Sequence, residues 1–452
     1  MKCIKSITKS ASIYLLLLAT TICFTACGSQ QSIETNGDGS KGITADKGAL
    51  VGFDGAVADV GGEGIKSEGV AEYEGEYNGE APDEPLIDSE EPLVDSEESI
   101  IDSDEQLIET DSDKIGMLTA GEWNDHNNWG FFKNLIDTKT IELPNFCLDI
   151  SNRIKVNVKN TVGEPIPNER VFLYGDDDST IWSAVTDKNG VAYLFEFEVD
   201  TARKVVSSTG AEAEISKLET DTQSTDAKVS DREVELVIDS EPTAYANMQI
   251  QFIVDTTGSM GDEMLYLQSD FRAIAEEVGT DNKEFSTVFY RDTSDDYVVK
   301  SNDFTSVIED ITSQLGNESA DGGGDLPEAV SEALDSAFNE LSWQDETVKI
   351  AFLIFDAPPH EDEASIEKLN NAIRNASDKG IKVVPIVSSN SQRETELFGR
   401  TLAIATNGTY VFLTDDSGIG GSHLEPIIGD YEVEKLHDII VRLINDYSQS
   451  GD

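Results

Sequence analysis

The sequence predicts an α/β protein: a doubly wound, mostly parallel sheet, preceded by an all-β sandwich and an acidic segment. Three observations lead to this prediction. Strand and helix patterns alternate from Met248 onward, a period-two pattern dominates residues 150–240, and residues 27–115 are rich in Gly, Ser and acids with few aromatics. We divide the chain into a signal segment, a disordered acidic linker, an aromatic lead-in with sandwich, and the α/β domain, at 1–26, 27–115, 116–244 and 245–452.

The composition limits the classes of function. The 452 residues are enough for more than one domain, and 89 acids against 32 bases give a formal charge of −57. Nucleic-acid binding is excluded, because phosphate contacts require Lys and Arg side chains on the protein.

The first residues are typical of a targeting signal. Lys2, Lys5 and Lys9 precede a short apolar run over residues 11–22, which is too short to span a bilayer well. Phe24-Thr25-Ala26-Cys27 then resembles the lipobox of bacterial lipoproteins. The resemblance implies that Cys27 is lipidated and that the protein is anchored to a membrane on its extracytoplasmic side, at the cell surface or the periplasmic face. Secretory cleavage without a lipid is the alternative.

The acidic linker contains a seven-residue repeat, in four copies that begin at Glu84, Glu91, Glu98 and Glu105. Adjacent apolar pairs and prolines oppose a continuous helix in these repeats. We interpret the segment as an extended spacer; low-affinity binding of Ca²⁺ by its acids is the alternative.

The lead-in, residues 116–148, is aromatic and is expected to dock onto the next domain. Carbohydrate stacking by Trp123 and Trp129 is the alternative. Cys147, between Phe146 and Leu148, is interpreted as a small core residue rather than a nucleophile.

Alternation and turn residues predict the strands of the sandwich, and residues 205–231 are expected to form a loop within it. The run from Gly163 to Leu194 resembles the Ig-like or transthyretin-like modules of bacterial surface proteins. The predicted strands are 153–159, 171–174, 181–185, 191–199 and 233–238.

In the α/β part, apolar runs predict parallel strands at 249–254, 285–290, 349–355, 382–387 and 410–413, with an antiparallel edge strand at 297–300. Helices are predicted between them, at 262–278, 305–315, 327–341, 364–379, 391–405 and 431–447.

Hard oxygen donors follow the first of these strands. Asp255, Thr257 and Ser259 alternate in a tight turn, so their side chains can converge above the end of the sheet. Oxygen donors of this kind suit Mg²⁺ or another hard divalent cation, and ligands of open α/β sheets bind at the carboxyl ends of the strands. Two further acids fall where such a site needs them: Asp325 after a glycine loop, and Asp356 at the end of a buried strand.

These motifs together closely resemble the von Willebrand factor A domain with its metal-ion-dependent adhesion site. Asp255, Thr257 and Ser259 match the family's D-x-S/T-x-S segment, and Asp356 matches the acid after the fourth strand. The resemblance implies a Rossmann-like fold and one divalent cation, Mg²⁺ or else Mn²⁺ or Ca²⁺, whose shell a partner's acidic residue completes. Asp325 stands where the family has a threonine, and a third carboxylate would weaken the attraction for an acidic partner. Arg291 and His360 are expected at the rim of this metal site.

The leading interpretation is a non-enzymatic, surface-anchored, monomeric lipoprotein that binds a protein partner through the cation, for adhesion or complex assembly. One alternative is a metal-dependent hydrolase or phosphatase with Asp255 as nucleophile. Another is a structural surface protein without a ligand.

Overall fold

The computed structural model describes residues 118–197, 201–215, 232–324, 326–418 and 421–448. The predicted signal segment with Cys27, the acidic linker with its repeats, and Asp325 lie outside the described residues. Within the described ranges, no helix is long and apolar enough to cross a membrane.

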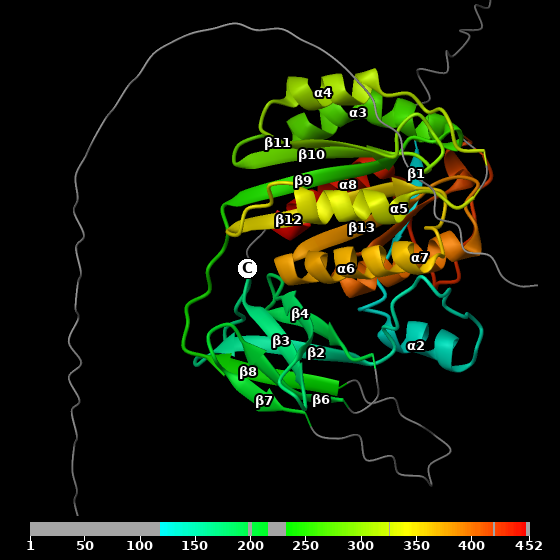
Figure 1. Cartoon of the computed structure of the whole chain (residues 1–452). Coiled ribbons are helices and arrows are strands. Elements are labelled where there is room, and N and C mark those ends of the chain that lie inside the picture. Colours follow the sequence, from blue (N-terminus) through cyan, green and yellow to red (C-terminus); the bar gives the residue numbers. More distant parts are fainter. Residues whose placement is uncertain (1–117, 198–200, 216–231, 325, 419–420, 449–452) are drawn as a thin grey trace, which may run out of the picture. The chain divides into compact units, whose positions relative to one another are not determined.

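The α/β part is built on one eight-stranded sheet with the strand order β11-β10-β9-β12-β13-β14-β1-β15 (Figure 1). The five strands β10, β9, β12, β13 and β14 run parallel to one another, and β11 pairs antiparallel with β10 as an edge strand. The parallel strands are β9 (Asn247–Asp255), β10 (Lys283–Tyr290), β12 (Thr347–Phe355), β13 (Ile381–Val387) and β14 (Tyr410–Leu413); the edge strand β11 is Val299–Thr305.

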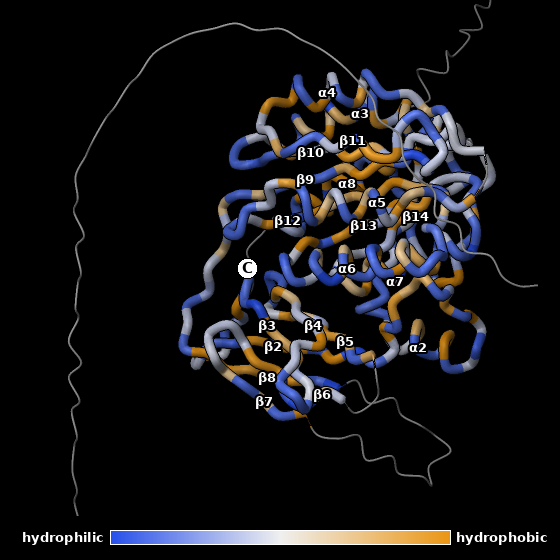
Figure 2. The backbone as a smooth tube through the Cα atoms, in the orientation of Figure 1, coloured by the Kyte–Doolittle hydropathy of each residue, from blue (hydrophilic) through white to orange (hydrophobic). Residues whose placement is uncertain are grey.

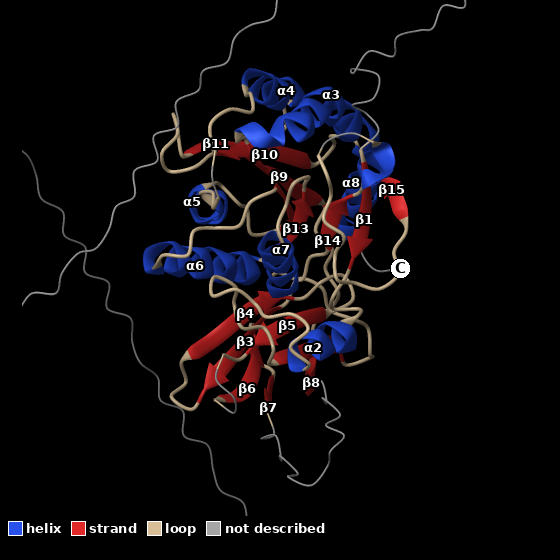
Figure 3. Cartoon of the chain, turned by 90° about the vertical axis from the view of Figure 1, so that its right-hand side faces the viewer, coloured by secondary structure: helices blue, strands red, loops and turns tan. Residues whose placement is uncertain are grey.

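Helices cover both faces of this sheet (Figure 3). Residues of β9 alternate between two separate cores: Phe252 packs in a cluster with α3, α4 and α8, whereas Ile253 packs in a cluster with α5, α6 and α7. The central strands are therefore apolar on both faces, as their orange tubes show in Figure 2. The predicted fold class is confirmed. The helices are α3 (Gly261–Val278), α4 (Ile308–Asn317), α5 (Val330–Asp335), α6 (Glu363–Lys379), α7 (Arg393–Ala405) and α8 (Leu436–Ser448).

The lead-in differs from its prediction, because it supplies a strand to the α/β sheet. β1 (Thr119–Trp123) pairs antiparallel with β14 on one side and with the short β15 (Val433–Lys435) on the other. A Cβ on Gly121 would lie 2.4 Å from the Phe412 ring, so glycine permits this close pairing. The predicted helix 431–447 consequently starts only at Leu436, after β15.

The aromatics of the lead-in serve packing. Trp129, in α2 (Trp129–Asp137), is 5% exposed and lies under the Arg153 guanidinium, so it offers no face to a carbohydrate. Trp123 donates its indole N–H to Asp125 and packs edge-on against Phe131. Burial raises the pKa of the Cys147 thiol to about 12, as expected for a core residue and not for a nucleophile.

Residues 153–238 form two sheets, β5-β2-β8 and β4-β3-β6-β7, around a shared apolar core. The predicted loop over residues 205–231 is wrong for its first part, because β6 extends to Ser207 and β7 pairs with it; residues 216–231 lie outside the described ranges. The strands are β2 (Arg153–Asn160), β3 (Arg170–Gly175), β4 (Thr180–Val185), β5 (Val191–Phe195), β6 (Ala202–Ser207), β7 (Glu212–Glu214) and β8 (Arg232–Ile238).

Polar contacts join the two-sheet module to α6. The Trp182 indole N–H donates to the Ser377 hydroxyl at 3.0 Å, and the Ser183 hydroxyl donates to Asp378 at 2.7 Å. Arg374 donates to the carbonyl of Ile181 at 2.8 Å. These bonds fix the module against the helix that follows β12.

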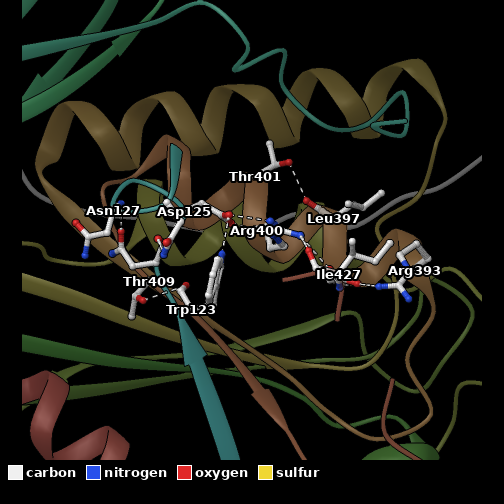
Figure 4. Close-up of polar contacts among 12 residues, drawn as sticks. Trp123, Asp125, Asn127, Arg393, Leu397, Arg400, Thr401, Thr409 and Ile427 are labelled. Atoms are coloured by element: carbon white, nitrogen blue, oxygen red, sulfur yellow. Dashed lines mark hydrogen bonds and ion pairs between the residues drawn. The ribbon is translucent and has the colours of Figure 1, made fainter. Parts of the chain in front are cut away.

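A buried ion network ties the lead-in to α7 (Figure 4). The fully buried Arg400 guanidinium makes two parallel bonds to Asp125, at 2.7 and 2.9 Å, and a third to Glu396 at 3.1 Å. Arg400 also donates to the Ile427 carbonyl at 2.9 Å. One side chain therefore holds three segments that are distant in the sequence.

Candidate functional site

The turn after β9 brings three oxygen donors of the sequence motif together. The backbone N–H and the hydroxyl of Thr257 both donate to Asp255 Oδ1, at 2.9 and 2.7 Å. The Ser259 hydroxyl lies 3.4 Å from that of Thr257. Asp255 Oδ2 is buried without a hydrogen-bond partner. The turn therefore leaves one carboxylate oxygen and two hydroxyls on the same side of the strand end.

Asp356 joins this group from the neighbouring strand. β12 pairs in parallel with β9, so the two strands end at the same edge of the sheet and place Asp356 beside Asp255. The Asp356 side chain is buried, and its Oδ1 atom also has no hydrogen-bond partner.

Glu328 is a member of the group that the sequence analysis missed. Its backbone N–H donates to the Pro358 carbonyl at 3.1 Å, which holds it beside the loop that follows Asp356. A Cβ placed on Gly323 would lie 3.0 Å from both Glu328 Oε1 and the Thr257 Cβ, so the Glu328 carboxyl group reaches the motif turn. Glu328 is 3% exposed, and its Oε2 atom has no hydrogen-bond partner.

The predicted and observed helix starts explain why Glu328 was missed. The predicted helix begins at Pro327, which makes Glu328 an ordinary residue of the first helical turn. The observed helix α5 begins only at Val330, so Glu328 belongs to the glycine loop. The sequence offered one indication of its role: Glu328 is an acid beside the glycine loop that was expected to supply a metal ligand. Asp325, the predicted donor of this loop, lies outside the described residues.

The pKa of each of the three carboxyl groups is raised. Burial and then the charge of Asp356 raise the pKa of Asp255 to about 7. Burial, followed by the charges of Asp255 and other nearby acids, raises the pKa of Glu328 to about 9. Burial also raises the pKa of Asp356, although a hydrogen bond from Ser259 opposes the rise. Among the described residues, no Lys or Arg forms an ion pair with any of the three. The group is thus short of positive charge.

A second layer of acids positions the loops around this group. Asp295 accepts hydrogen bonds from the backbone N–H groups of Gly323, at 2.9 Å, and Asp292, at 3.0 Å. Gly322 has a φ of +79°, and a Cβ there would lie 2.5 Å from Asp295 Oδ1, so this position requires glycine. On the other side, Glu263 accepts from the backbone N–H and the hydroxyl of Ser389.

The two predicted rim residues have different surroundings. His360 is partly exposed, and its Nε2 atom lies 2.6 Å from Asp292 Oδ1. Arg291 is largely buried, donates to the Ser319 carbonyl at 2.9 Å and lies over the Tyr297 ring. His360 is therefore the more accessible of the two.

The donor set mixes hydroxyl and carboxyl oxygens. In the part of the chain that the structure describes, no three His, Cys, Asp or Glu side chains are arranged so that they alone could hold a metal ion. Any cation at this position would need the hydroxyls of Thr257 and Ser259 as well as the acids.

Replacing Glu328 tests whether it acts with the motif residues. We expect Glu328→Gln to weaken Mn²⁺ binding by roughly 10- to 100-fold, as loss of a charged group beside a metal does. Calorimetric titration of the full chain measures the effect. Glu332→Gln is the matched control, because Glu332 belongs to α5 and pairs with Lys368 at 2.9 Å. Equal Mn²⁺ affinity in the Glu328→Gln variant and the wild type would place Glu328 outside the metal's surroundings.

Comparison with known proteins gives one family. Residues 249–422 match the family model of the von Willebrand factor A domain. A curated relative, a putative ariadne-like RING finger protein of Acanthamoeba polyphaga mimivirus, is 30% identical over 117 residues. That match covers 25% of this chain and 11% of the viral protein, so the chain spans about a tenth of that relative's length.

Solved structures are also similar to this chain. BatB of Bacteroides thetaiotaomicron is 15% identical with a TM-score of 0.33, and the match covers 45% of this chain and 99% of BatB. An aerotolerance-related membrane protein of Bacteroides fragilis is 18% identical with a TM-score of 0.30, over 44% of this chain and 100% of that one. A von Willebrand factor type A protein of Catenulispora acidiphila is 17% identical with a TM-score of 0.28, and the match covers 46% of this chain and 43% of that one.

Proposed function

We propose that this protein binds a protein partner through one divalent cation, without catalysing a reaction. The match of residues 249–422 to the family model of the von Willebrand factor A domain supports this proposal. The observation that carries the proposal is the set of buried, unpaired oxygens at the ends of β9 and β12. Asp255 Oδ2, Asp356 Oδ1 and Glu328 Oε2 all lack a hydrogen-bond partner. Buried carboxyl oxygens without partners are costly, and a cation offsets that cost.

The residues present fit a hard divalent ion. Mg²⁺, Mn²⁺ and Ca²⁺ all prefer oxygen ligands, and Mg²⁺ keeps several waters when a protein supplies few charged ligands. Asp255, Thr257, Ser259 and Asp356 would hold the cation, with Glu328 beside them. Asp325 remains a predicted ligand from the sequence.

Each residue has a separate task in this proposal. Asp255 orients Thr257 through the two bonds to Oδ1, which hold the Thr257 hydroxyl beside the carboxyl group. Asp295 holds the glycine loop through Gly323 and so fixes the approach to the site. The bound cation supplies a positive charge that attracts an oxygen donor of the partner. His360, on the rim, is available to contact that partner.

We propose that the binding domain acts outside the cytoplasm. The support is the targeting signal with its lipobox-like residues 24–27. Lipidated Cys27 would attach the chain to a membrane, and residues 27–115 would act as a spacer between the membrane and the binding domain. A monomer suffices for this function, because one chain supplies all the proposed ligands.

Metal titration tests the proposal directly. We expect Mn²⁺ to bind the wild-type chain in calorimetry with one ion per chain. Asp255→Ala and Asp356→Ala should each reduce the affinity by on the order of 100-fold, the upper end of what loss of one group at a metal site costs. Glu361→Ala is the control, because Glu361 is exposed and follows Asp356 closely in the sequence. The same aspartate variants should lose chelator-sensitive capture of surface proteins. Wild-type affinity in both aspartate variants would reject the proposed site.

A further inference from the structure

A cleft of about 740 Å³ lies at the opposite end of the sheet from the acidic site. Residues at the amino ends of β12 and β13 line it, together with residues of β3, of the turn after β4 and of the end of α8. Its volume is within the range of about 300–1,000 Å³ that is usual for sites binding small molecules. The cleft is therefore large enough for an organic ligand.

Positive side chains gather in this cleft. Lys349 and Lys382 lie at the starts of the adjacent strands β12 and β13, and both are more than nine-tenths buried. Arg170, Lys188 and Lys379 also line the cleft. In a chain with 89 acids and only 32 bases, five bases around one cavity are an unusual concentration.

The buried ammonium groups of Lys349 and Lys382 make few hydrogen bonds. Within the described ranges, Lys349 Nζ donates to two carbonyls alone, those of Asp345 at 3.2 Å and Thr347 at 3.4 Å. Lys382 Nζ donates to the Val185 carbonyl at 3.4 Å. Among the described residues, neither forms an ion pair with a carboxylate. Each ammonium has three donors, so hydrogen-bonding capacity remains for a ligand.

The acids of the cleft compensate this positive charge only in part. Glu122 is engaged by Arg442 at 2.8 Å, whereas the charge of Asp187 acts on Lys382 and that of Asp345 on Lys349. Asp345 and Asp446 line the cleft but form no ion pair with its lysines in the described part of the chain.

The electrostatics of the two lysines agree with an anion site. Burial lowers the pKa of both Lys349 and Lys382 to about 8, although the charges of Asp345 and Asp187 oppose the lowering; at Lys349 nearby bases add to it. A bound anion would favour the charged form of each side chain and so oppose both effects.

We propose that this cleft binds a small phosphate-bearing molecule, with Lys349 and Lys382 holding the phosphate group. Lysine binds phosphate as a compact point charge and suits a buried phosphate of this kind. Lys188 adds charge from the two-sheet module, and so does Arg170, which also pairs with Asp378 at 3.7 Å. The ligand would contact both the sheet and the module, so its binding would stabilise their contact.

The test uses inorganic phosphate and pyrophosphate with the full chain. EDTA is present throughout, so that neither probe can bind through a cation at the acidic site, and sodium chloride keeps the ionic strength constant. We expect pyrophosphate to bind in calorimetry and to raise the midpoint of thermal unfolding, since a ligand that binds only the folded state stabilises it. Lys349→Gln and Lys382→Gln should each weaken binding by roughly tenfold or more, because each removes a charge-assisted hydrogen bond to the phosphate.

Two further variants keep the test decisive. Lys188→Gln removes a partly exposed lysine of the same cleft, so it should not impair folding. It should weaken pyrophosphate binding less than Lys349→Gln or Lys382→Gln does, and it keeps the test usable if those buried substitutions prevent folding. Lys368→Gln, whose lysine pairs with Glu332 on α5, should leave binding unchanged. Absence of binding by both probes would overturn the proposal, as would equal pyrophosphate affinity in the wild type and the Lys188, Lys349 and Lys382 variants. Loss of Mn²⁺ binding in the aspartate variants concerns the acidic site alone.

Discussion

As the pH rises from about 4 to 8, the free energy of unfolding of the metal-free protein is expected to fall because of Asp255. The pKa of Asp255 is about 7 in the folded chain against an ordinary value of 3.8, so the folded state holds this proton more tightly than the unfolded state. Between these two pH values the folded state keeps a proton that the unfolded state has released, so a rise in pH favours the unfolded state and the free energy of unfolding falls. A difference of about three between the two pKa values corresponds to roughly 4 kcal/mol.

The measurement compares Asp255→Asn with the wild type, because an asparagine side chain stays neutral at every pH. Urea unfolding in EDTA across the range from mildly acidic to mildly basic pH should show the wild type losing up to roughly 4 kcal/mol relative to the variant. The comparison cancels the pH dependence that the rest of this acidic chain contributes to both proteins. A difference that stays constant over this pH range would contradict the raised pKa of Asp255.

Adding a cation should reverse the effect. At a pH of about 8, Mn²⁺ at about 100 times its dissociation constant is expected to raise the free energy of unfolding of the wild type by about 2.7 kcal/mol. The Asp255→Asn variant should gain less, because it lacks the charge that attracts the ion. Mn²⁺ titration during urea unfolding therefore links the electrostatics of the acidic site to its proposed ligand.

The parts of the acidic site that depend on local sequence could be predicted. Asp255, Thr257 and Ser259 belong to one turn, and alternation within the turn is enough to place them together. Asp356 could be placed because it ends a buried strand, and parallel strands end at the same edge of a sheet. Glu328 could not, since its position depends on a loop that pairs with the segment after Asp356. Such long-range backbone pairing leaves no periodic pattern.

The sheet shows the same division between local and distant information. The parallel strands are long apolar runs, and their positions could be predicted within a few residues. β1 and β15 are short, and each exists because it pairs with a strand far away in the sequence. Their own residues show no clear alternation, so tertiary pairing decides their conformation.

Replacing Arg400 is expected to cause a large loss of stability. Arg400→Met would leave Asp125 buried without its ion-pair partner, whereas Glu396 would keep its pair with Arg393. Breaking a buried ion pair by removing one partner costs about 3–5 kcal/mol, because the remaining charge stays out of water. Urea unfolding at neutral pH measures this loss.

An exposed arginine provides the control for this prediction. Arg272 pairs with Glu309 at 3.4 Å on the surface, and such pairs contribute less than about 1 kcal/mol. Arg272→Met should therefore change the free energy of unfolding little. The double variant Arg400→Met/Asp125→Asn should recover part of the loss, because it removes the buried carboxylate that has lost its partner. Equal losses in Arg400→Met and Arg272→Met would show that the Arg400 network does not hold the lead-in on α7.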